Sequence, residues 1–235
     1  IDENNPEDLL SFVSYLKREQ YGSRPLLKGQ LFTAEITDQK KGEAVYRKGK
    51  EKYEIADYKM DYIYDPAHTS ILPRAWSNAP HHVEKYREIM GLRQGVKPSF
   101  IDNMYFMFHH QLGTMYFRYF MWNFSGRESD IQGADWMGIP AALKKVPSAL
   151  EENKARNIFF GIPLIIGLIG LLFQYYKDPY NFLFVAMLFF LTGAAIVLYL
   201  NSPPVEPRER DYIYAGSYYA FAFWIGLGVI GLFRG

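Results

Sequence analysis

The sequence predicts an α-helical membrane protein with a small α+β soluble segment, built from three transmembrane helices and one aromatic interfacial helix. Two observations lead to this prediction. Runs at 157–176, 181–200 and 215–233 contain no Asp, Glu, Lys, Arg or His, and each is close to the roughly 20 residues that a helix needs to cross a bilayer. Most charged residues lie instead in 1–156, where short runs of alternating apolar residues are typical of strands.

The connection between the second and third runs is the most distinctive segment. Asn201–Tyr214 reads NSPPVEPRERDYIY, with three prolines and five charged residues. Proline fixes the backbone, and charged side chains stay out of hydrocarbon. We therefore expect a tight, charged loop at a membrane face.

Composition excludes several classes of function. The net charge of +1 argues against a nucleic-acid partner, because phosphate binding needs a concentrated basic surface. The chain has no cysteine, so disulfides, thiolate metal sites and cysteine nucleophiles are excluded. Aromatic residues make up 17% of the chain, and Tyr and Trp favour membrane–water interfaces.

The chain opens at Ile1 without a signal peptide and stops at Arg234-Gly235, so we expect a fragment of a longer membrane protein.

We divide the chain into a soluble α+β segment at 1–98, an aromatic helix and polar loop at 99–156, and a membrane region at 157–235. The first segment begins with a helix that Asn5 and Pro6 would start and Gly22 would end. Four short β-like runs then predict an antiparallel meander, with turns at 38–42 and 48–50. These runs are Leu31–Ile36, Ala44–Tyr46, Tyr53–Ile55 and Tyr58–Ile63.

The adjacent pair His81-His82 invites a metal interpretation that its spacing does not support. Neighbouring side chains do not share a helix face, and no further ligand follows at i+4. We expect no metal site here, and the pair is instead consistent with the start of a helix.

Residues 98–124 predict a long aromatic helix. Apolar residues recur at i, i+3 and i+4: Ile101, Met104, Tyr105, Phe108, Leu112, Met115, Tyr116 and Tyr119. His109, His110 and Arg118 would be costly inside lipid. We therefore expect a helix in the membrane interface, or one packed against the spans.

The polar loop that follows this helix holds a candidate cluster, Arg127, Glu128 and Asp130. These residues are suited to acid–base chemistry or equally to a solvated turn.

Small residues in the three runs predict close helix packing. They are Gly161, Gly167 and Gly170 in the first run, Gly193, Ala194 and Ala195 in the second, and Ala222 and Gly226 in the third.

Three stretches together resemble a known family. They read YLKREQYGSRPLL at 15–27, YFMWNFSGRESDIQG at 119–133, and LYLNSPPVEPRERDYIYAGSYYAFAFWIGLG at 198–228. The chain resembles an internal part of a bacterial multi-span membrane family of unknown function, common in Bacteroidetes. That family is related to the animal protein O-mannosyltransferase that acts on plexin-type domains.

The resemblance implies a glycosyltransferase of the GT-C type, which transfers a sugar from a polyprenyl-phosphate donor at the non-cytoplasmic face, with protein O-mannosylation as one version. It also implies that the catalytic carboxylate lies outside this chain, so the catalytic residue is unknown here. The resemblance indicates no cofactor besides the lipid-linked sugar donor.

The charged loop is the candidate site for the donor phosphate. Guanidinium groups suit phosphate, so we assign donor binding to Arg208 and Arg210 with Tyr212, and the orienting role to Glu209 or Asp211. The alternative is an ion-paired loop that anchors the helix ends and turns its arginines to lipid headgroups.

Membrane side and partners follow less directly. The positive-inside rule places the soluble segment and the loop in the cytoplasm, whereas the resemblance places them outside a bacterial inner membrane, which we prefer. Expected partners are membrane lipids, further spans of the same protein or neighbouring membrane subunits, and a protein acceptor.

The competing function is a non-catalytic membrane subunit or scaffold that binds partner proteins. A transporter is disfavoured because no ionisable residue lies inside a predicted span.

Overall fold

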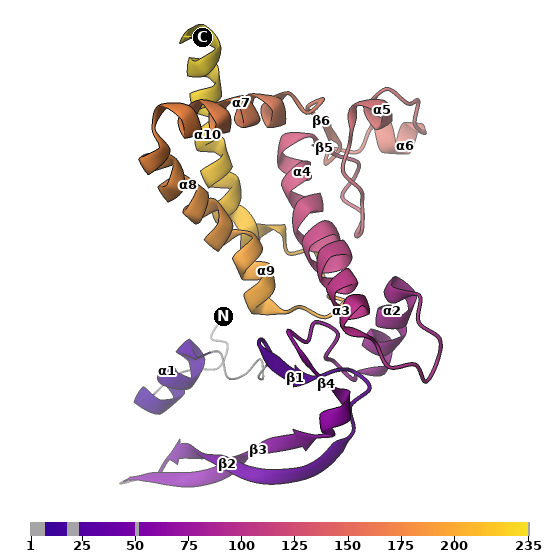
Figure 1. The fold of residues 1–235 in the computed structure, drawn as a ribbon, viewed down its shortest axis with the longest axis vertical. Helices are drawn as coiled ribbons and strands as arrows, with labels where there is room; N and C mark the ends of the chain where they lie inside the picture. Colours follow the sequence, from indigo (N-terminus) through magenta and orange to yellow (C-terminus); the bar gives the residue numbers. More distant parts are fainter. Residues whose placement is uncertain (1–7, 18–23, 50–51, 235) are drawn as a thin grey trace.

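A computed structural model describes residues 8–17, 24–49 and 52–234, and it is a mixed structure dominated by helices (Figure 1). The strands are β1 (Lys28–Gln30), β2 (Ile36–Lys48), β3 (Tyr53–Tyr64), β4 (Thr69–Ile71), β5 (Gly126–Arg127) and β6 (Asn157–Ile158). The helices of the first half are α1 (Leu9–Leu16), η2 (Pro66–His68), α2 (Pro80–Met90), α3 (Phe100–Tyr105), η3 (Phe106–Phe117) and α4 (Arg118–Phe124). Those of the second half are α5 (Ile139–Ala142), α6 (Ser148–Glu151), α7 (Ile162–Lys177), α8 (Pro179–Thr192), α9 (Ala194–Leu200), η4 (Asp211–Tyr214) and α10 (Ala215–Arg234).

Two helices in the described part of the chain, not three, are long and apolar enough to cross a membrane. They are Pro179–Leu200, formed by α8 and α9, and Asp211–Phe233, formed by η4 and α10. In the first predicted run, α7 has only 16 residues, about 24 Å of helix. The reason lies at its start, where β6 pairs with β5 and Gly161 takes a positive φ of 69°. These residues therefore form a strand and a turn instead of a first helical turn.

The apolar helices pack through glycine, as the sequence predicted for Gly167 and Gly170; Gly161 instead lies in the turn before α7. A Cβ on Gly170 would lie 1.7 Å from the Trp224 carbonyl oxygen, and one on Gly228 would lie 2.0 Å from the Ile166 carbonyl oxygen. The backbones of α7 and α10 therefore touch, which only small residues permit. A Cβ on Gly226 would meet no heavy atom within 4 Å, so this part of the predicted Ala222–Gly226 surface does not contact another helix in the described structure.

The long helix α3–η3–α4 is the element that joins the two halves of the molecule. Phe106 lies in a buried cluster with Phe32 and Tyr86 of the soluble segment. Further along the same helix, Tyr116 packs in a cluster with Tyr214, and a third cluster surrounds the end of the helix. The predicted helix is thus confirmed: its first part packs against the soluble segment, and η3 and α4 pack against the apolar helices. Figure 1 shows it running between the two halves.

The middle of this helix has π-helical hydrogen bonds, in which an N–H bonds to the carbonyl five residues back. The N–H of Arg118, for example, donates to the Gly113 carbonyl. This wider turn shifts the buried face, so Ile101 and Phe108 of the predicted apolar stripe are 78% and 62% exposed, whereas Gln111 is fully buried.

The predicted meander is wrong in its topology. β2 and β3 form one long antiparallel hairpin whose register shifts between Lys41 and Ala44. The predicted turn at 38–42 lies inside β2, because the extra residues are accommodated as bulges. A separate two-stranded sheet pairs β1 with β4.

At the start of α1, the Asp8 carboxylate accepts from the backbone N–H groups of Leu10 and Ser11, and the Ser11 hydroxyl accepts from the Asp8 N–H, which completes a capping box. The cap expected from Asn5 and Pro6, and the stop expected from Gly22, lie outside the described residues.

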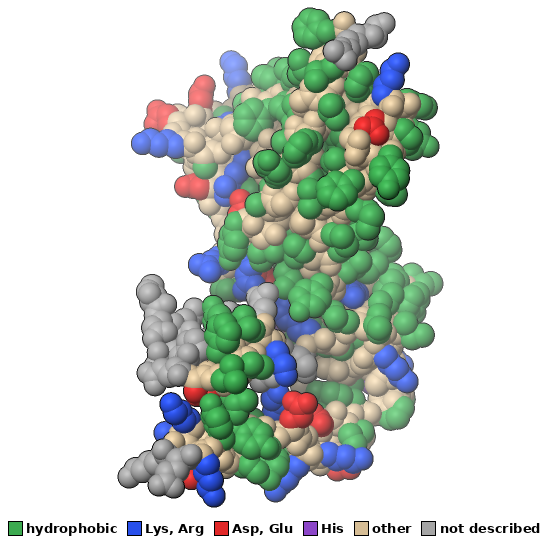
Figure 2. Space-filling view, turned by 90° about the vertical axis from the view of Figure 1, so that its left-hand side faces the viewer, with side chains coloured by type: hydrophobic (Ala, Val, Ile, Leu, Met, Phe, Trp, Pro, Cys, Tyr) green, Lys and Arg blue, Asp and Glu red, His purple; other side chains and the backbone are tan. Residues whose placement is uncertain are grey.

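Surface character changes along the long axis. On the face seen in Figure 2, hydrophobic side chains cover much of the centre and right of the upper part, whereas Lys, Arg, Asp and Glu lie along its left edge, in the middle and at the base, where the hairpin lies. Only 11% of the most apolar window of Pro179–Leu200 is buried within the structure. A helix that faces lipid has such an exposed apolar surface.

Candidate functional site at the 201–214 loop

Asn201 fixes the start of the 201–214 loop. It has a positive φ of 41°, a conformation that Asn tolerates better than other side chains. Its fully buried side-chain amide donates to the carbonyl oxygens of Pro25 at 2.7 Å and Pro73 at 2.8 Å, and accepts from Gln111 at 3.1 Å. Its own carbonyl accepts from the Trp76 indole at 2.9 Å. One residue thus ties the loop to the soluble segment and to η3.

Two arginines of the soluble segment satisfy the end of α9. Arg24 donates to the Leu200 carbonyl at 2.5 Å, and Arg74 donates to the Leu198 carbonyl at 2.9 Å. The last carbonyls of a helix have no partner within the helix and carry its negative dipole end. Positive side chains therefore stabilise this helix end and hold the loop against the soluble segment.

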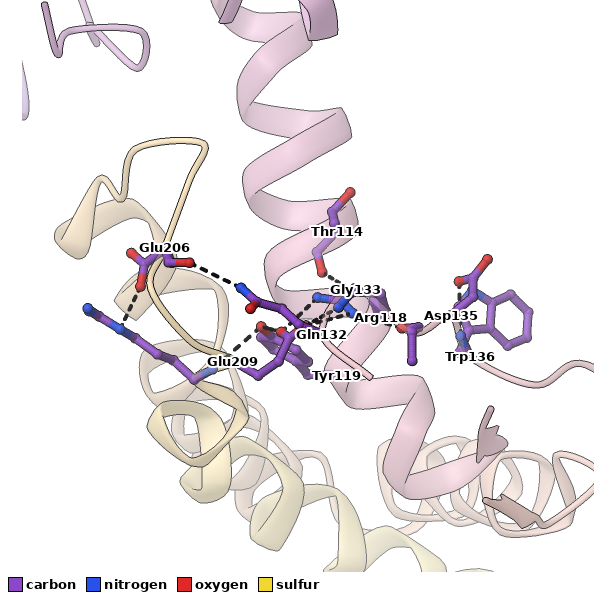
Figure 3. Close-up of polar contacts among 11 residues, drawn as sticks. Thr114, Arg118, Tyr119, Gln132, Gly133, Asp135, Trp136, Glu206 and Glu209 are labelled. Atoms are coloured by element: carbon purple, nitrogen blue, oxygen red, sulfur yellow. Dashed lines mark hydrogen bonds and ion pairs between the residues drawn. The ribbon is translucent and has the colours of Figure 1, made fainter. Parts of the chain in front are cut away.

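Glu209 anchors the other half of the loop. Arg118 of α4 donates to both of its carboxylate oxygens, at 2.9 and 3.4 Å, and the Gly133 N–H donates at 2.6 Å. Tyr119 adds a short hydrogen bond from its hydroxyl. Figure 3 shows these groups converging on Glu209 from α4 and from the loop that follows it.

The charges of this pair are almost removed from water, with side-chain exposures of 11% for Arg118 and 19% for Glu209. Burial alone would raise the pKa of Glu209. The hydrogen bonds from Tyr119, Arg118 and Gly133 outweigh burial and hold this pKa below its usual value. Arg118 also donates to the Ala134 carbonyl at 2.8 Å. Both buried charges therefore have hydrogen-bond partners, and the pair holds the 201–214 loop against α4.

Arg210 is paired within the loop. Its Nε lies 2.5 Å from a Glu206 carboxylate oxygen, and the Glu206 carbonyl accepts from Gln132 at 3.2 Å (Figure 3). Glu206 therefore sets the direction of the Arg210 side chain, a role that the sequence had suggested for Glu209 or Asp211.

Arg208 differs from its neighbours. It is exposed, and no hydrogen bond or ion pair joins its guanidinium to another residue in the part of the chain that the structure describes. Tyr212 is 59% exposed close by in sequence, and Asp211 opens η4. Of the predicted phosphate-binding residues, Arg208 and Tyr212 are thus the ones that face outward.

The second candidate cluster does not converge on one point. Arg127 stacks on the Trp122 ring with its guanidinium 4.0 Å from the ring centroid, and Asp130 accepts from the Asn153 amide at 2.8 Å. The hydrogen bond from Asn153 is the main cause that lowers the pKa of Asp130. The backbone N–H of Glu128 donates to the Asp135 carbonyl. These contacts hold the loop in place, and they do not bring an acid and a base of the cluster together.

Sequence reasoning missed the residues that hold the site, above all Arg118, Gln111 and Asn201. One signal was present: polar side chains inside an aromatic helix need partners. His110 belongs to the same group, because burial lowers its pKa to about 4 while a hydrogen bond to the Pro204 carbonyl opposes that shift. Among the described residues, no three His, Asp or Glu side chains gather as metal ligands.

Fold and site together define a protein with membrane-length apolar helices, a mixed α/β segment and a braced charged loop between them. Comparison with known proteins adds one finding: residues 22–108 match a family of unknown function (DUF8416). The match covers β1 to α3 and the start of η3, which is less than half of the chain. No curated protein and no solved structure matches the chain. None of these findings links it to plexin-domain O-mannosyltransferases or to GT-C enzymes, so that relation remains a proposal.

Proposed function

We propose that this chain is part of an integral-membrane glycosyltransferase of the GT-C type and that the 201–214 loop binds the phosphate of a polyprenyl-phosphate-linked sugar. The observation that carries the proposal is the exposed guanidinium of Arg208, which has no partner among the described residues, in a loop between two helices of membrane-spanning length. The chemical class of the donor comes from the sequence resemblance at 198–228.

The way the loop is held supports this assignment. Asn201 fixes one end and Glu209 fixes the middle, and three prolines stiffen the chain between them. A loop ordered before binding loses less conformational entropy when it binds its ligand. Arg210, aligned by Glu206 through its Nε, can contribute its two terminal nitrogens to the same phosphate as Arg208.

Sugar transfer and donor binding test the proposal in the complete protein in native-like membranes. Arg208→Ala removes the exposed guanidinium, Arg208→Lys keeps its charge, and Arg47→Ala removes an exposed arginine from the β2–β3 hairpin as the control. We expect Arg208→Ala to weaken binding of a polyprenyl phosphate by about tenfold or more and to reduce transfer. Arg208→Lys should recover part of both, and Arg47→Ala should match wild type.

Donor binding and transfer that are equal in Arg208→Ala and wild type would remove the phosphate site from this loop. If the wild-type protein transfers no sugar from any of several polyprenyl-phosphate donors, the glycosyltransferase proposal itself fails.

The scaffold is the second candidate, and the hairpin favours it. β2 and β3 pair only with each other in the described structure, and they expose large apolar side chains on both strands: Ile36, Val45, Tyr46, Tyr53, Ile55, Tyr58, Met60, Tyr62 and Ile63. Two-stranded hairpins are marginal alone, so a partner protein would stabilise this one. A complete protein that lacks transfer but is recovered with a stoichiometric partner would support the scaffold.

We also propose a bacterial inner-membrane location with the loop and the soluble segment outside the cytoplasm. Because the chain has no cysteine, a single Lys48→Cys variant reports the side of the hairpin. Labelling of intact cells by a membrane-impermeant maleimide supports the external orientation, and labelling only after lysis contradicts it.

A further inference from the structure

A cavity of about 620 Å³ lies in the soluble segment between the end of β3, the residues from 24 to 34 around β1, and Trp76 and Asn78. This volume is within the usual range for small-molecule sites. The cavity lies entirely within the part of the chain that matches a family model, since its lining residues fall between 24 and 78.

The lining combines aromatic surfaces with hydrogen-bonding groups. Tyr62, Tyr64 and Trp76 supply ring faces, while Asn78 and Gln30 supply amide groups. The Asp61 carboxylate lies on the other face of β3, against Gly42. Tyr62 and Tyr64 lie two residues apart on β3, which places both side chains on one face of the strand. Flat apolar rings beside polar groups match a ligand that has both a hydrophobic face and a rim of hydroxyl groups.

The walls of the cavity are fixed by contacts outside it. The Trp76 indole donates to the Asn201 carbonyl at 2.9 Å, and Arg24 donates to the Leu200 carbonyl at 2.5 Å. Gly29 lies close to Pro25, where a Cβ would come within 2.4 Å of the proline side chain. A site with positioned walls binds its ligand at a lower entropic cost.

The charges argue against an anionic ligand. Arg24 and Asp61 are the two charged residues of the lining, and the Arg24 guanidinium is bonded to the end of α9 instead of facing a phosphate. A purely hydrophobic ligand would leave the Asn78 and Gln30 amides without partners, which is costly.

We infer that this cavity is a binding site for an uncharged saccharide unit, with a pyranose ring stacked on Tyr62 or Tyr64 and its hydroxyl groups bonded to Asn78 and Gln30. The cavity borders the end of α9 through Trp76 and Arg24, so a saccharide held there lies beside the proposed membrane face. Arg208 is not part of its lining, so this site and the lipid-phosphate site fail or stand separately.

Binding of methyl glycosides to the complete protein in lipid nanodiscs tests the site. The probes are the methyl pyranosides of glucose, galactose, mannose and N-acetylglucosamine, followed by saturation-transfer NMR. We expect at least one of them to bind, with Tyr62→Ala and Asn78→Ala each weakening its affinity by about tenfold. Tyr58→Ala is the matched control, because Tyr58 lies on the same strand but outside the cavity lining.

Equal melting temperatures of the Tyr62→Ala and Tyr58→Ala proteins establish that a loss of binding is local. Arg208→Ala should leave glycoside binding unchanged, whatever its effect on a lipid phosphate. The inference is overturned if none of the four glycosides binds at tens of millimolar, or if binding is unchanged in both Tyr62→Ala and Asn78→Ala. It is also overturned if an extended peptide or inorganic phosphate binds and the glycosides do not.

Discussion

A single residue, Glu209, stabilises the 201–214 loop through its contact with Arg118. Glu209→Gln keeps the size of the side chain but leaves the Arg118 guanidinium, with its side chain 11% exposed, without a countercharge. We expect the free energy of unfolding to fall by about 2–3 kcal/mol, because hydrogen bonds to charged groups are lost in a poorly hydrated place. Chemical or thermal unfolding in detergent measures this change.

Asp211→Asn is the matched control for Glu209→Gln. It also removes one carboxylate charge from the loop region, but no side-chain partner of Asp211 is found among the described residues. Its effect should stay within about 0.5 kcal/mol. Equal effects of the two variants would mean that the Arg118–Glu209 contact does not stabilise the loop.

His110 makes stability depend on pH at the same scale. Burial is the main cause that lowers its pKa from 6.5 to about 4, helped by the nearby positive charges of His109, Lys85 and Arg118. Above pH 6.5 the ring is neutral in both the folded and the unfolded chain. As the pH falls, the unfolded chain takes up the proton first, so the free energy of unfolding decreases between pH 6.5 and about 4.

At about pH 5 we expect a loss on the order of 2 kcal/mol relative to neutral pH. Melting temperatures across this range measure it. His110→Gln should flatten the dependence, whereas His109→Gln, at an exposed position, should retain it. A pH dependence that survives in His110→Gln would assign it to other groups.

The crossing of α7 and α10 gives a prediction at the scale of elements. Gly170→Ala would place its Cβ 1.7 Å from the Trp224 carbonyl oxygen and 2.5 Å from the Gly228 nitrogen. Backbone atoms cannot turn aside as a side chain does, so the two helices must separate. We expect destabilisation of about 1–3 kcal/mol, as in other overpacked sites, and a lower melting temperature in detergent.

Gly226→Ala in α10 is the control for that variant, since its Cβ would meet no heavy atom within 4 Å. It should be neutral or slightly stabilising, because alanine is the better helix former. If Gly170→Ala is also neutral, α7 and α10 are not in the close contact described.

Sequence patterns predicted the helices well and their ends poorly. The long uncharged runs located α8–α9 and α10, because hydrophobicity over about twenty residues is a strong signal. The start of α7 was wrong because β6 pairs with β5, a strand distant in the sequence. Such a non-local contact leaves no mark in a local pattern. The π-helical turns of η3 likewise follow from packing, and they moved the buried face away from the predicted stripe.

At the scale of the whole molecule, the candidate loop was predictable from its prolines and charges, but its surroundings were not. The partners of Asn201 are Pro25, Pro73, Trp76 and Gln111, which belong to three segments distant in sequence. No spacing rule connects them. The apolar helices and the soluble segment are therefore joined by buried polar contacts in addition to the packing along the α3–η3–α4 helix.

This arrangement predicts that one side chain couples the soluble segment to the membrane helices. Asn201→Gly keeps the positive φ of 41° accessible but removes the amide that bonds to Pro25, Pro73 and Gln111. We expect faster amide hydrogen exchange in the soluble segment around β1 and β4, while exchange in α8 and α10 changes little. The reason is that losing the amide weakens the contact between the soluble segment and the helices more than it weakens either part.

Asn201→Asp, which keeps the acceptor but loses both donated bonds, should act in the same direction. Asn123→Ala, at an exposed position with one bond inside its own helix, should leave exchange unchanged. Uniformly faster exchange through the whole molecule in Asn201→Gly would instead show that soluble segment and helices unfold as one cooperative unit.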